Sequence, residues 1–275
     1  MRILLQIVVV VAVSWVAGTG VQALGWNWPL TLVVGLLAAV LAVAAYGWIV
    51  RRTEHREPTE VAWKTAPGAL ARGALIGLLM FAAVIANIAF LGGYEVRGLG
   101  SVTGALAIFG FMAAVAVTEE LMFRGLLFRL VERRFGTGVS LTLSGLLFGF
   151  AHFFNANATL WTSLAIAVEA GFMLAAAYAA TRTLWVPIGV HFAWNYAQGG
   201  IFSTSVSGQD APQGLLDGVT SGPAVVSGGA FGPEASIYSV VFGIAVTAAF
   251  LWLAKRRGHL VPRRGATAPA ATLGA

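Results

Sequence analysis

Two adjacent glutamates and an arginine stand inside an apolar stretch near the middle of the sequence. Glu119 and Glu120 are neighbours, and Arg124 follows Glu120 by four residues. Residues four apart share one face of an α-helix, so Glu120 and Arg124 are predicted to pair. Glu119 is turned about 100° away and is left without that arginine. Ionisable groups inside a membrane segment cost roughly 2.5–3.5 kcal/mol on insertion scales, so these residues are candidates for a functional site.

Two later apolar segments carry histidines whose spacing also suits one helix face. His152 follows Phe148 by four residues, and His191 precedes Asn195 by four. Hydrolysis of an amide needs an activated water, a proton shuttle and donors for the developing oxyanion. Glutamate, histidine and a His/Asn pair are chemically adequate for these tasks. Glu169, on another apolar segment, could line the same cavity or pair with a histidine.

Each of these residues also has a purely structural interpretation. A membrane histidine commonly forms a hydrogen bond between helices, and Asn195 alone could do the same. The Glu120–Arg124 pair could anchor the end of a helix. However, polar sets occur on three separate segments, and the apolar runs within residues 1–100 carry no comparable groups. We therefore expect one shared site in the fourth to seventh apolar segments.

The composition is that of an integral membrane protein. Of the 275 residues, 58% are hydrophobic and 10% are charged, and the mean hydropathy is +0.82. Soluble proteins carry about 25% charged residues. The net charge of +6 comes from basic residues at the ends of apolar runs, which are topology signals and not a nucleic-acid-binding patch. The chain has no cysteine, which excludes disulfides and thiolate chemistry.

The apolar runs predict an all-α fold, a polytopic transmembrane helix bundle of about eight spans. Residues 1–100 are expected to hold three spans, and residues 101–201 a catalytic core of four spans. Residues 202–235 are rich in Gly, Ser and Pro and contain no Lys or Arg, so an extracytoplasmic loop is expected. Its end near Glu234 could cap the site from outside, but an ordinary loop is the prediction. Residues 236–275 are expected to form the last span and a basic cytoplasmic tail.

The basic residues orient the predicted bundle. The four core spans are predicted at residues 102–134, 137–154, 158–180 and 183–202. With eight spans, most Lys and Arg residues fall on one side, which places both termini in the cytoplasm. The first apolar run resembles a signal peptide, but it is longer than the usual run of about 7–15 apolar residues, so an uncleaved span is expected.

Three motifs follow one another on successive apolar segments. They are Glu119-Glu120-x-x-x-Arg124, Phe148-x-x-x-His152 and His191-x-x-x-Asn195. In this order they resemble the motifs of the CPBP intramembrane protease family, also called the ABI family. That family includes the type II CAAX prenyl endopeptidases and bacterial bacteriocin-processing or self-immunity proteins. The resemblance covers about residues 101–201.

The resemblance implies a role for each motif residue. These roles are Glu119 as general base for water, His152 as its assistant, His191 and Asn195 as oxyanion donors, and Glu120 and Arg124 as supports of the site. A zinc ion could take Glu119, His152 and His191 as ligands, with one water. The sequence lacks the HExxH spacing, and the glutamate-dependent mechanism of the family needs no metal, so no cofactor is expected.

The expected function is that of a CAAX prenyl endopeptidase-like intramembrane protease that acts on a membrane-associated protein or peptide. Nothing in the sequence supports a prenylated C-terminus as its substrate. The alternative is a non-catalytic member of the same family that protects or scaffolds a partner, as in bacteriocin immunity. A transporter with a proton relay is a third interpretation, and the lack of a polar cluster in the first three runs counts against it. The expected partners are the lipid bilayer and a membrane substrate, and no nucleic acid.

Overall fold

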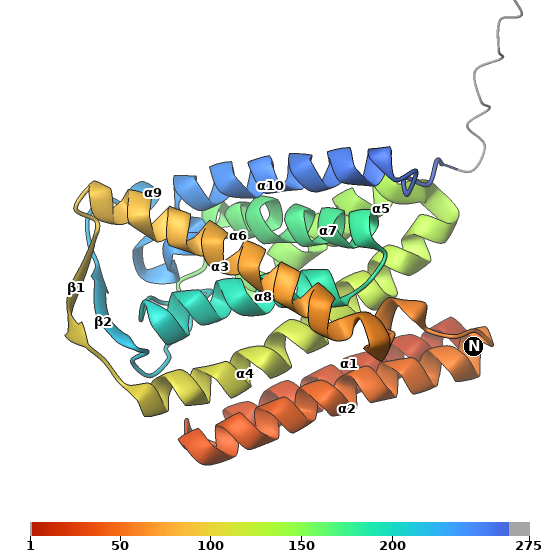
Figure 1. Cartoon of the computed structure of the whole chain (residues 1–275), viewed down its shortest axis with the longest axis horizontal. Coiled ribbons are helices and arrows are strands. Elements are labelled where there is room, and N and C mark those ends of the chain that lie inside the picture. Colours follow the sequence, from red (N-terminus) through yellow and green to blue (C-terminus); the bar gives the residue numbers. More distant parts are fainter. Residues whose placement is uncertain (1, 264–275) are drawn as a thin grey trace, which may run out of the picture.

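The computed structural model describes residues 2–263, and helices dominate them (Figure 1). The α-helices are α1 (Arg2–Gln22), α2 (Trp28–Glu54), α3 (Ala66–Phe90), α4 (Val102–Glu120), α5 (Arg129–Ala151), α6 (Leu160–Ile166), α7 (Met173–Thr181), α8 (Trp185–Asn195), α9 (Ala224–Ser227) and α10 (Ile237–Arg256). The π-helical segments are η3 (Leu121–Phe128), η5 (Ala167–Phe172) and η6 (Tyr196–Ile201). Short 3₁₀ turns are η1 (Thr59–Val61), η2 (Trp63–Thr65), η4 (His152–Phe154), η7 (Gly229–Phe231) and η8 (Pro233–Ala235). The strands are β1 (Tyr94–Leu99) and β2 (Leu216–Thr220).

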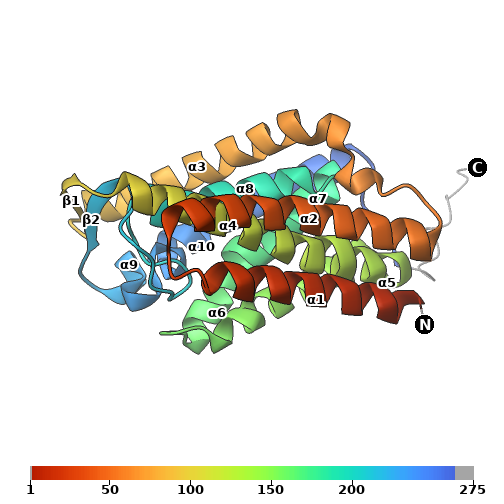
Figure 2. The ribbon, with the colours of Figure 1, turned by 90° about the horizontal axis from the view of Figure 1, so that it is seen from below.

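The long helices form an elongated bundle in which most axes lie along one direction (Figures 1 and 2). α1 begins and α10 ends at the same end of the bundle, and the two strands lie at the opposite end. α1, α2 and α4 pack side by side, while α3 lies against α8 and α10 lies along α7. Because α7 and α8 are almost completely buried, they form the centre around which the other helices pack.

Glycines let α3 approach α8 closely. Gly73 and Gly77 of α3 face the backbone of α8, and a Cβ atom on Gly77 would overlap the carbonyl oxygen of Val190. Small residues of this kind let membrane helices pack through direct backbone contact. His191 follows Val190 directly, so this contact also fixes the position of a predicted site residue.

Within the described residues, six helices are long and apolar enough to cross a membrane, which confirms an all-α polytopic bundle and a multi-pass membrane protein but corrects the count of eight spans. The predicted fourth and fifth spans belong to one run of 53 residues, Val102–Phe154. This run bends at Gly136, whose φ of 80° and ψ of 172° are not helical. Ser144 Oγ donates to Phe123 O at 3.3 Å across 21 residues. A straight α-helix would separate these residues by about 31 Å, so the chain folds back between them.

The predicted seventh span is the second reason for the difference in count. α8 has 11 residues and η6 has 6, and together they fall short of the roughly 20 residues that a crossing helix needs. This short helix is covered by protein, since ten of the eleven residues of α8 are buried. The hydropathy of the sequence therefore identifies it as apolar without showing that neighbouring helices surround it.

Residues 202–235 contain more regular structure than the predicted loop. β1 and β2 pair antiparallel, with Tyr94 opposite Thr220 and Leu99 opposite Leu216. α9, η7 and η8 follow β2 and lead directly into α10. The sequence did not indicate this pairing because the two strands lie on opposite sides of the core in sequence. The last predicted span corresponds to α10, and residues 264–275 of the predicted tail lie outside the described residues.

A network of charged and polar side chains ties the helices together at the end where α1 begins. Arg129 Nη2 lies 2.6 Å from Glu54 Oε1, and Gln6 Nε2 donates to the same oxygen at 2.8 Å. The Tyr46 hydroxyl donates to Glu60 Oε1 at 2.7 Å. These contacts join α1, α2, η1 and α5, so the segments outside residues 101–201 are fixed to the predicted core.

Candidate active site

Glu120, Arg124 and His191 form a chain of buried polar contacts in the centre of the bundle. Arg124 Nη1 donates to Glu120 Oε1 at 2.8 Å, and both side chains are fully buried. His191 Nδ1 lies 3.0 Å from the same carboxylate oxygen. The pairing of Glu120 with Arg124 that the spacing predicts is therefore confirmed, and Glu120 also connects the end of α4 to α8.

Arg124 is held from two further sides. Its Nη2 donates to the carbonyl oxygen of Gly171 at 2.9 Å. Its guanidinium carbon lies 4.6 Å from the centre of the Phe148 ring, a distance at which a cation is attracted to the ring face. Arg124 thus connects η3 with η5 and α5, and it orients Glu120 through these contacts.

Glu119 approaches His191 and forms no ion pair with Arg124 among the described residues. Glu119 Oε2 lies 3.8 Å from His191 Nε2, and its side chain is 25% exposed whereas that of Glu120 is 0% exposed. The two ring nitrogens of His191 thus face different carboxylates. The sequence predicts this division into one neutralised acid and one acid free of the arginine.

His191 also lines a small cavity. The polar residues that line this cavity are His152, Glu169, His191, Asn195, Ser207 and Glu234. Its volume of about 10 Å³ is close to the roughly 10–15 Å³ that one water molecule needs. The structure therefore brings His152 and Asn195 together with His191 around the cavity. Glu119 is not part of this lining, so His191 is the residue that connects Glu119 to the cavity.

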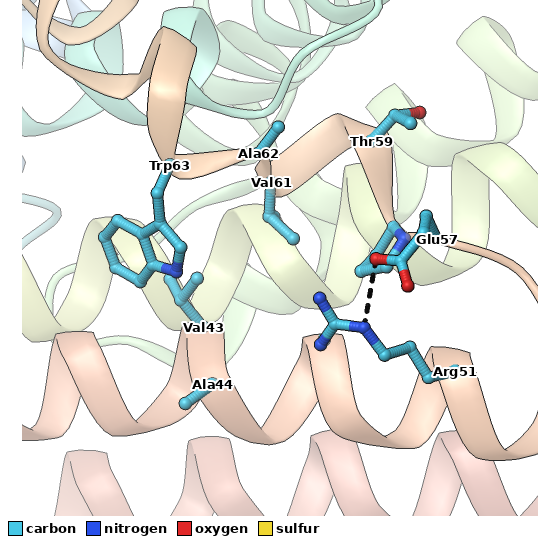
Figure 3. A pocket seen from close by; sticks show the side chains of 10 residues that line it. Val43, Ala44, Arg51, Glu57, Thr59, Val61, Ala62 and Trp63 are labelled. Carbon is cyan, nitrogen blue, oxygen red and sulfur yellow. Dashed lines mark hydrogen bonds and ion pairs between the residues drawn. The ribbon is translucent and has the colours of Figure 1, made fainter.

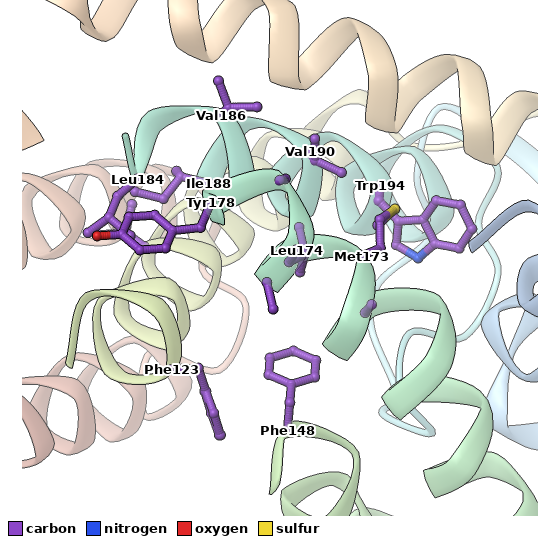
Figure 4. Packing of buried hydrophobic residues seen from close by; sticks show 14 of the residues in the cluster. Phe123, Phe148, Met173, Leu174, Tyr178, Leu184, Val186, Ile188, Val190 and Trp194 are labelled. Atoms are coloured by element: carbon purple, nitrogen blue, oxygen red, sulfur yellow. The ribbon is translucent and has the colours of Figure 1, made fainter. Parts of the chain in front are cut away.

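Phe148 packs against both histidines. The centre of its ring lies 4.8 Å from that of His152 and 5.8 Å from that of His191. His152 Nδ1 lies 2.8 Å from the Phe148 carbonyl oxygen, where α5 ends and η4 begins. Figure 4 shows Phe148 among buried side chains that include Leu174 and Trp194. This packing fixes His152 at the end of α5, facing the centre of the bundle.

The structure adds two residues of segment 202–235 to the predicted set. Ser207 and Glu234 line the cavity, and Glu234 is only 1% exposed. Sequence reasoning raised Glu234 only as part of a capping loop, because no helical spacing relates it to the three motifs. The available signal was an acid in a Gly-rich stretch that contains no basic residue. Glu169, predicted to line a cavity or pair with a histidine, does line the cavity.

The residues proposed as alternative zinc ligands do not form a metal cluster. Within residues 2–263, no group of three or more His, Asp or Glu side chains is arranged to hold a metal ion. His152 Nδ1 and His191 Nδ1 instead face the Phe148 carbonyl and Glu120. The expectation of no cofactor stays a prediction.

An apolar groove of about 570 Å³ lies between α2, α3, α4 and α8. It reaches Val117 on α4 and Phe192 on α8, which are two and one residues from Glu119 and His191 in sequence. Figure 3 shows a different pocket, near the end of α2, where Arg51 and Glu57 form an exposed ion pair of 3.1 Å. That pocket contains no histidine and none of the predicted site residues.

Comparison with known proteins identifies the core of the chain. Residues 101–197 match the sequence model of the family described as Type II CAAX prenyl endopeptidase Rce1-like. This segment contains all three motifs, and it is a domain of that family, so the predicted resemblance is confirmed. At the level of the family, the activity is that of an intramembrane CAAX-type protease. No curated protein and no solved structure matches the chain.

Proposed function

We propose that the protein is a glutamate-dependent intramembrane endopeptidase that hydrolyses a peptide bond of a membrane-associated protein or peptide. The position of His191 carries this proposal. A histidine that only joins two helices needs one partner, whereas His191 meets both Glu119 and Glu120 and lines a cavity of the size of one water. His191 thus links the two glutamates on one side to the cavity lined by His152 and Asn195 on the other, all within residues 101–197.

In the proposed mechanism, Glu119 accepts a proton from water while the water oxygen bonds to the scissile carbonyl carbon. His152 assists by orienting this water. The carbonyl oxygen gains negative charge, and His191 and Asn195 donate hydrogen bonds to it. The C–N bond then breaks as the proton passes from Glu119 to the leaving amine, which restores the carboxylate.

Glu120 and Arg124 act as supports in this proposal. Glu120 Oε1 faces His191 Nδ1 at 3.0 Å, and this contact holds the ring so that Nε2, the proposed oxyanion donor, points toward Glu119. Arg124 compensates the buried charge of Glu120, since an unpaired carboxylate at this depth would be costly. The substrate would approach through the apolar groove, which reaches both helices of the site.

The proposed orientation places both termini in the cytoplasm and segment 202–235 outside. The basic residues Arg51, Arg52, Arg129 and Lys255 belong to the ends of helices that lie where α1 begins and α10 ends. Segment 202–235 carries no Lys or Arg. By the positive-inside rule, the basic end faces the cytoplasm.

The first test compares membrane proteomes of cells that carry the wild type, Glu119→Gln or Glu57→Gln at equal expression. Glu57 is a matched control because it is an exposed acid in an ion pair outside the site. We expect new protein termini with the wild type and Glu57→Gln that are absent with Glu119→Gln. Identical termini in all three, with the cellular phenotype still rescued by Glu119→Gln, would overturn the protease proposal in favour of a scaffold.

A further inference from the structure

Two buried carboxyl groups that the proposed mechanism does not use face the same cavity. Glu169 lies in η5 and Glu234 in η8, and each is 1% exposed. Among the described residues, Glu169 Oε2 and Glu234 Oε1 are buried without a hydrogen-bond partner. Gly243 of α10 packs so closely on Glu169 that a Cβ atom there would overlap its backbone. The two acids are therefore enclosed by protein and close to the site residues.

Hydrogen bonds hold the segment that carries Glu234 against the core. Trp161 Nε1 donates to the carbonyl oxygen of Ala235 at 2.9 Å. Asn155 Nδ2 donates to the carbonyl oxygen of Ser207 at 3.0 Å. Segment 202–235 lies outside the residues that match the family, yet these contacts place it over the cavity.

No basic side chain compensates the two acids within the described residues. The other titratable side chains of the cavity are His152 and His191. The neighbouring elements add few titratable side chains. There is none in α6, α9 or η7, and α7 carries one tyrosine. The charged residues of α5 lie in its first two turns. α10 carries Tyr238 near its start, and Lys255 and Arg256 at its far end. The arginine of η3 is engaged with its own glutamate.

We propose that Glu169 and Glu234 share a proton as an acid pair, and that this pair positions segment 202–235 over the cavity of the protease. Two ionised carboxylates in one enclosed space repel each other, so such a pair retains a proton. The shared proton makes one acid a donor and the other an acceptor, which gives the unpartnered oxygens a partner. This inference rests on the proposed function: the pair lines the same cavity as Ser207 and His191, and its role is to position the segment, with no part in the proton transfer assigned to Glu119.

The pH dependence of the pair has a definite sign. Burial raises the pKa of Glu234 to about 7, against hydrogen bonds at Ser207 and the charge of His191. A glutamate in the unfolded chain has a pKa of about 4.3. Between these two values the folded protein binds more protons than the unfolded chain, so its stability falls as the pH rises through this window. Glutamine cannot ionise, so the fall should be absent in Glu234→Gln.

The first measurement is the pH profile of kcat/KM for the full chain in lipid nanodiscs, with a peptide taken from a substrate found in the proteome comparison. We expect Glu234→Gln and Glu169→Gln to match the wild type at pH 6. Above pH 7 the wild type should lose activity by about tenfold per pH unit relative to either variant, the slope for one proton. Asp210→Asn, which changes an exposed acid of the same segment, should follow the wild type.

The second measurement does not need activity. The difference in Tm between Glu234→Gln and the wild type should be near zero at pH 5 and positive at pH 8. A lower Tm at every pH, or unchanged pH profiles of both activity and Tm, would overturn the acid pair. If the wild type cleaves nothing, the proposed function fails, and the Tm curves alone still decide whether the pair shares a proton.

Discussion

His191 is the residue on which the site depends. Its Nδ1 lies 3.0 Å from Glu120 and its Nε2 lies 3.8 Å from Glu119, while the ring also lines the cavity. One imidazole therefore joins the buried ion pair, the free acid and the cavity. Substitutions of the residues around His191 should show which of them stabilise the fold and which take part in the reaction.

Loss of Glu120 should affect stability strongly. Glu120→Ala leaves Arg124 buried without its carboxylate, and breaking a buried pair in this way costs about 3–5 kcal/mol. Glu57→Ala breaks the exposed pair with Arg51 and should cost about 0–1 kcal/mol. Equilibrium unfolding in mixed micelles measures both. Equal losses in the two variants would contradict the structural role of Glu120.

Asn195 should matter for rate more than for folding. If it donates to the oxyanion, Asn195→Ala should lower kcat by about 10²–10³, as the loss of one such donor does in other hydrolases. KM and Tm should change little, because the Asn195 side chain forms no hydrogen bond with the described residues. A rise in KM with an unchanged kcat would show that Asn195 only binds the substrate.

At the scale of single residues, helical spacing predicted the pairs and missed the residues of segment 202–235. Glu120 and Arg124, or Phe148 and His152, each lie on a continuous helical stretch that joins two elements, so a spacing of four residues relates them. Glu234 reaches the cavity through turns and a strand pairing. No periodicity connects it to the motifs, so the sequence could name it only as the end of a loop.

The elements that carry the site share an unusual feature. The π-helical segments η3, η5 and η6 follow Glu120, contain Glu169 and follow Asn195, respectively. Each wide turn changes the direction in which the following side chains point, and such segments are common at functional sites. The sequence predicted these stretches as α-helices because composition does not distinguish the two kinds of helix. The positions of the site residues thus depend on backbone detail that was not predictable.

The contact between α3 and α8 should be sensitive to side-chain size. Gly77→Leu would force α3 away from the backbone of α8 near Val190, and overpacking of this kind typically costs about 1–3 kcal/mol. Activity should fall further than stability, because α8 carries the His/Asn pair. Gly68→Leu is the control on the same helix, since nothing lies near a Cβ atom there. A harmless Gly77→Leu would show that this contact does not position α8.

At the scale of the whole molecule, hydropathy predicted the class of protein correctly and the number of spans less well. The bend at Gly136 falls between the predicted fourth and fifth spans, so the sequence separated these two limbs although one helical run contains both. An apolar run does not show whether protein surrounds it, as at α8, because that depends on packing between distant segments. The family domain, in contrast, was predicted from three short motifs and is confirmed. The order of these motifs along the chain does not depend on where the boundaries of the spans are drawn.

The topology can be tested directly because the chain contains no cysteine. Single cysteines at exposed positions, Glu57→Cys and Asp210→Cys, would be treated with a membrane-impermeant maleimide on intact cells. We expect only Asp210→Cys to react, because segment 202–235 faces outward in the proposed orientation. Glu57→Cys should react after the cells are opened. The reverse pattern would show that the bundle is inverted.

The groove between α2, α3, α4 and α8 has a kinetic consequence. Its lining is almost entirely apolar and includes exposed side chains such as Leu36 and Val40, so a substrate that enters there comes sideways out of the lipid. Its encounter rate then depends on the number of substrate molecules per lipid and not per litre. Adding empty lipid to a fixed amount of enzyme and substrate should slow cleavage, even though no inhibitor is present and the total volume is unchanged.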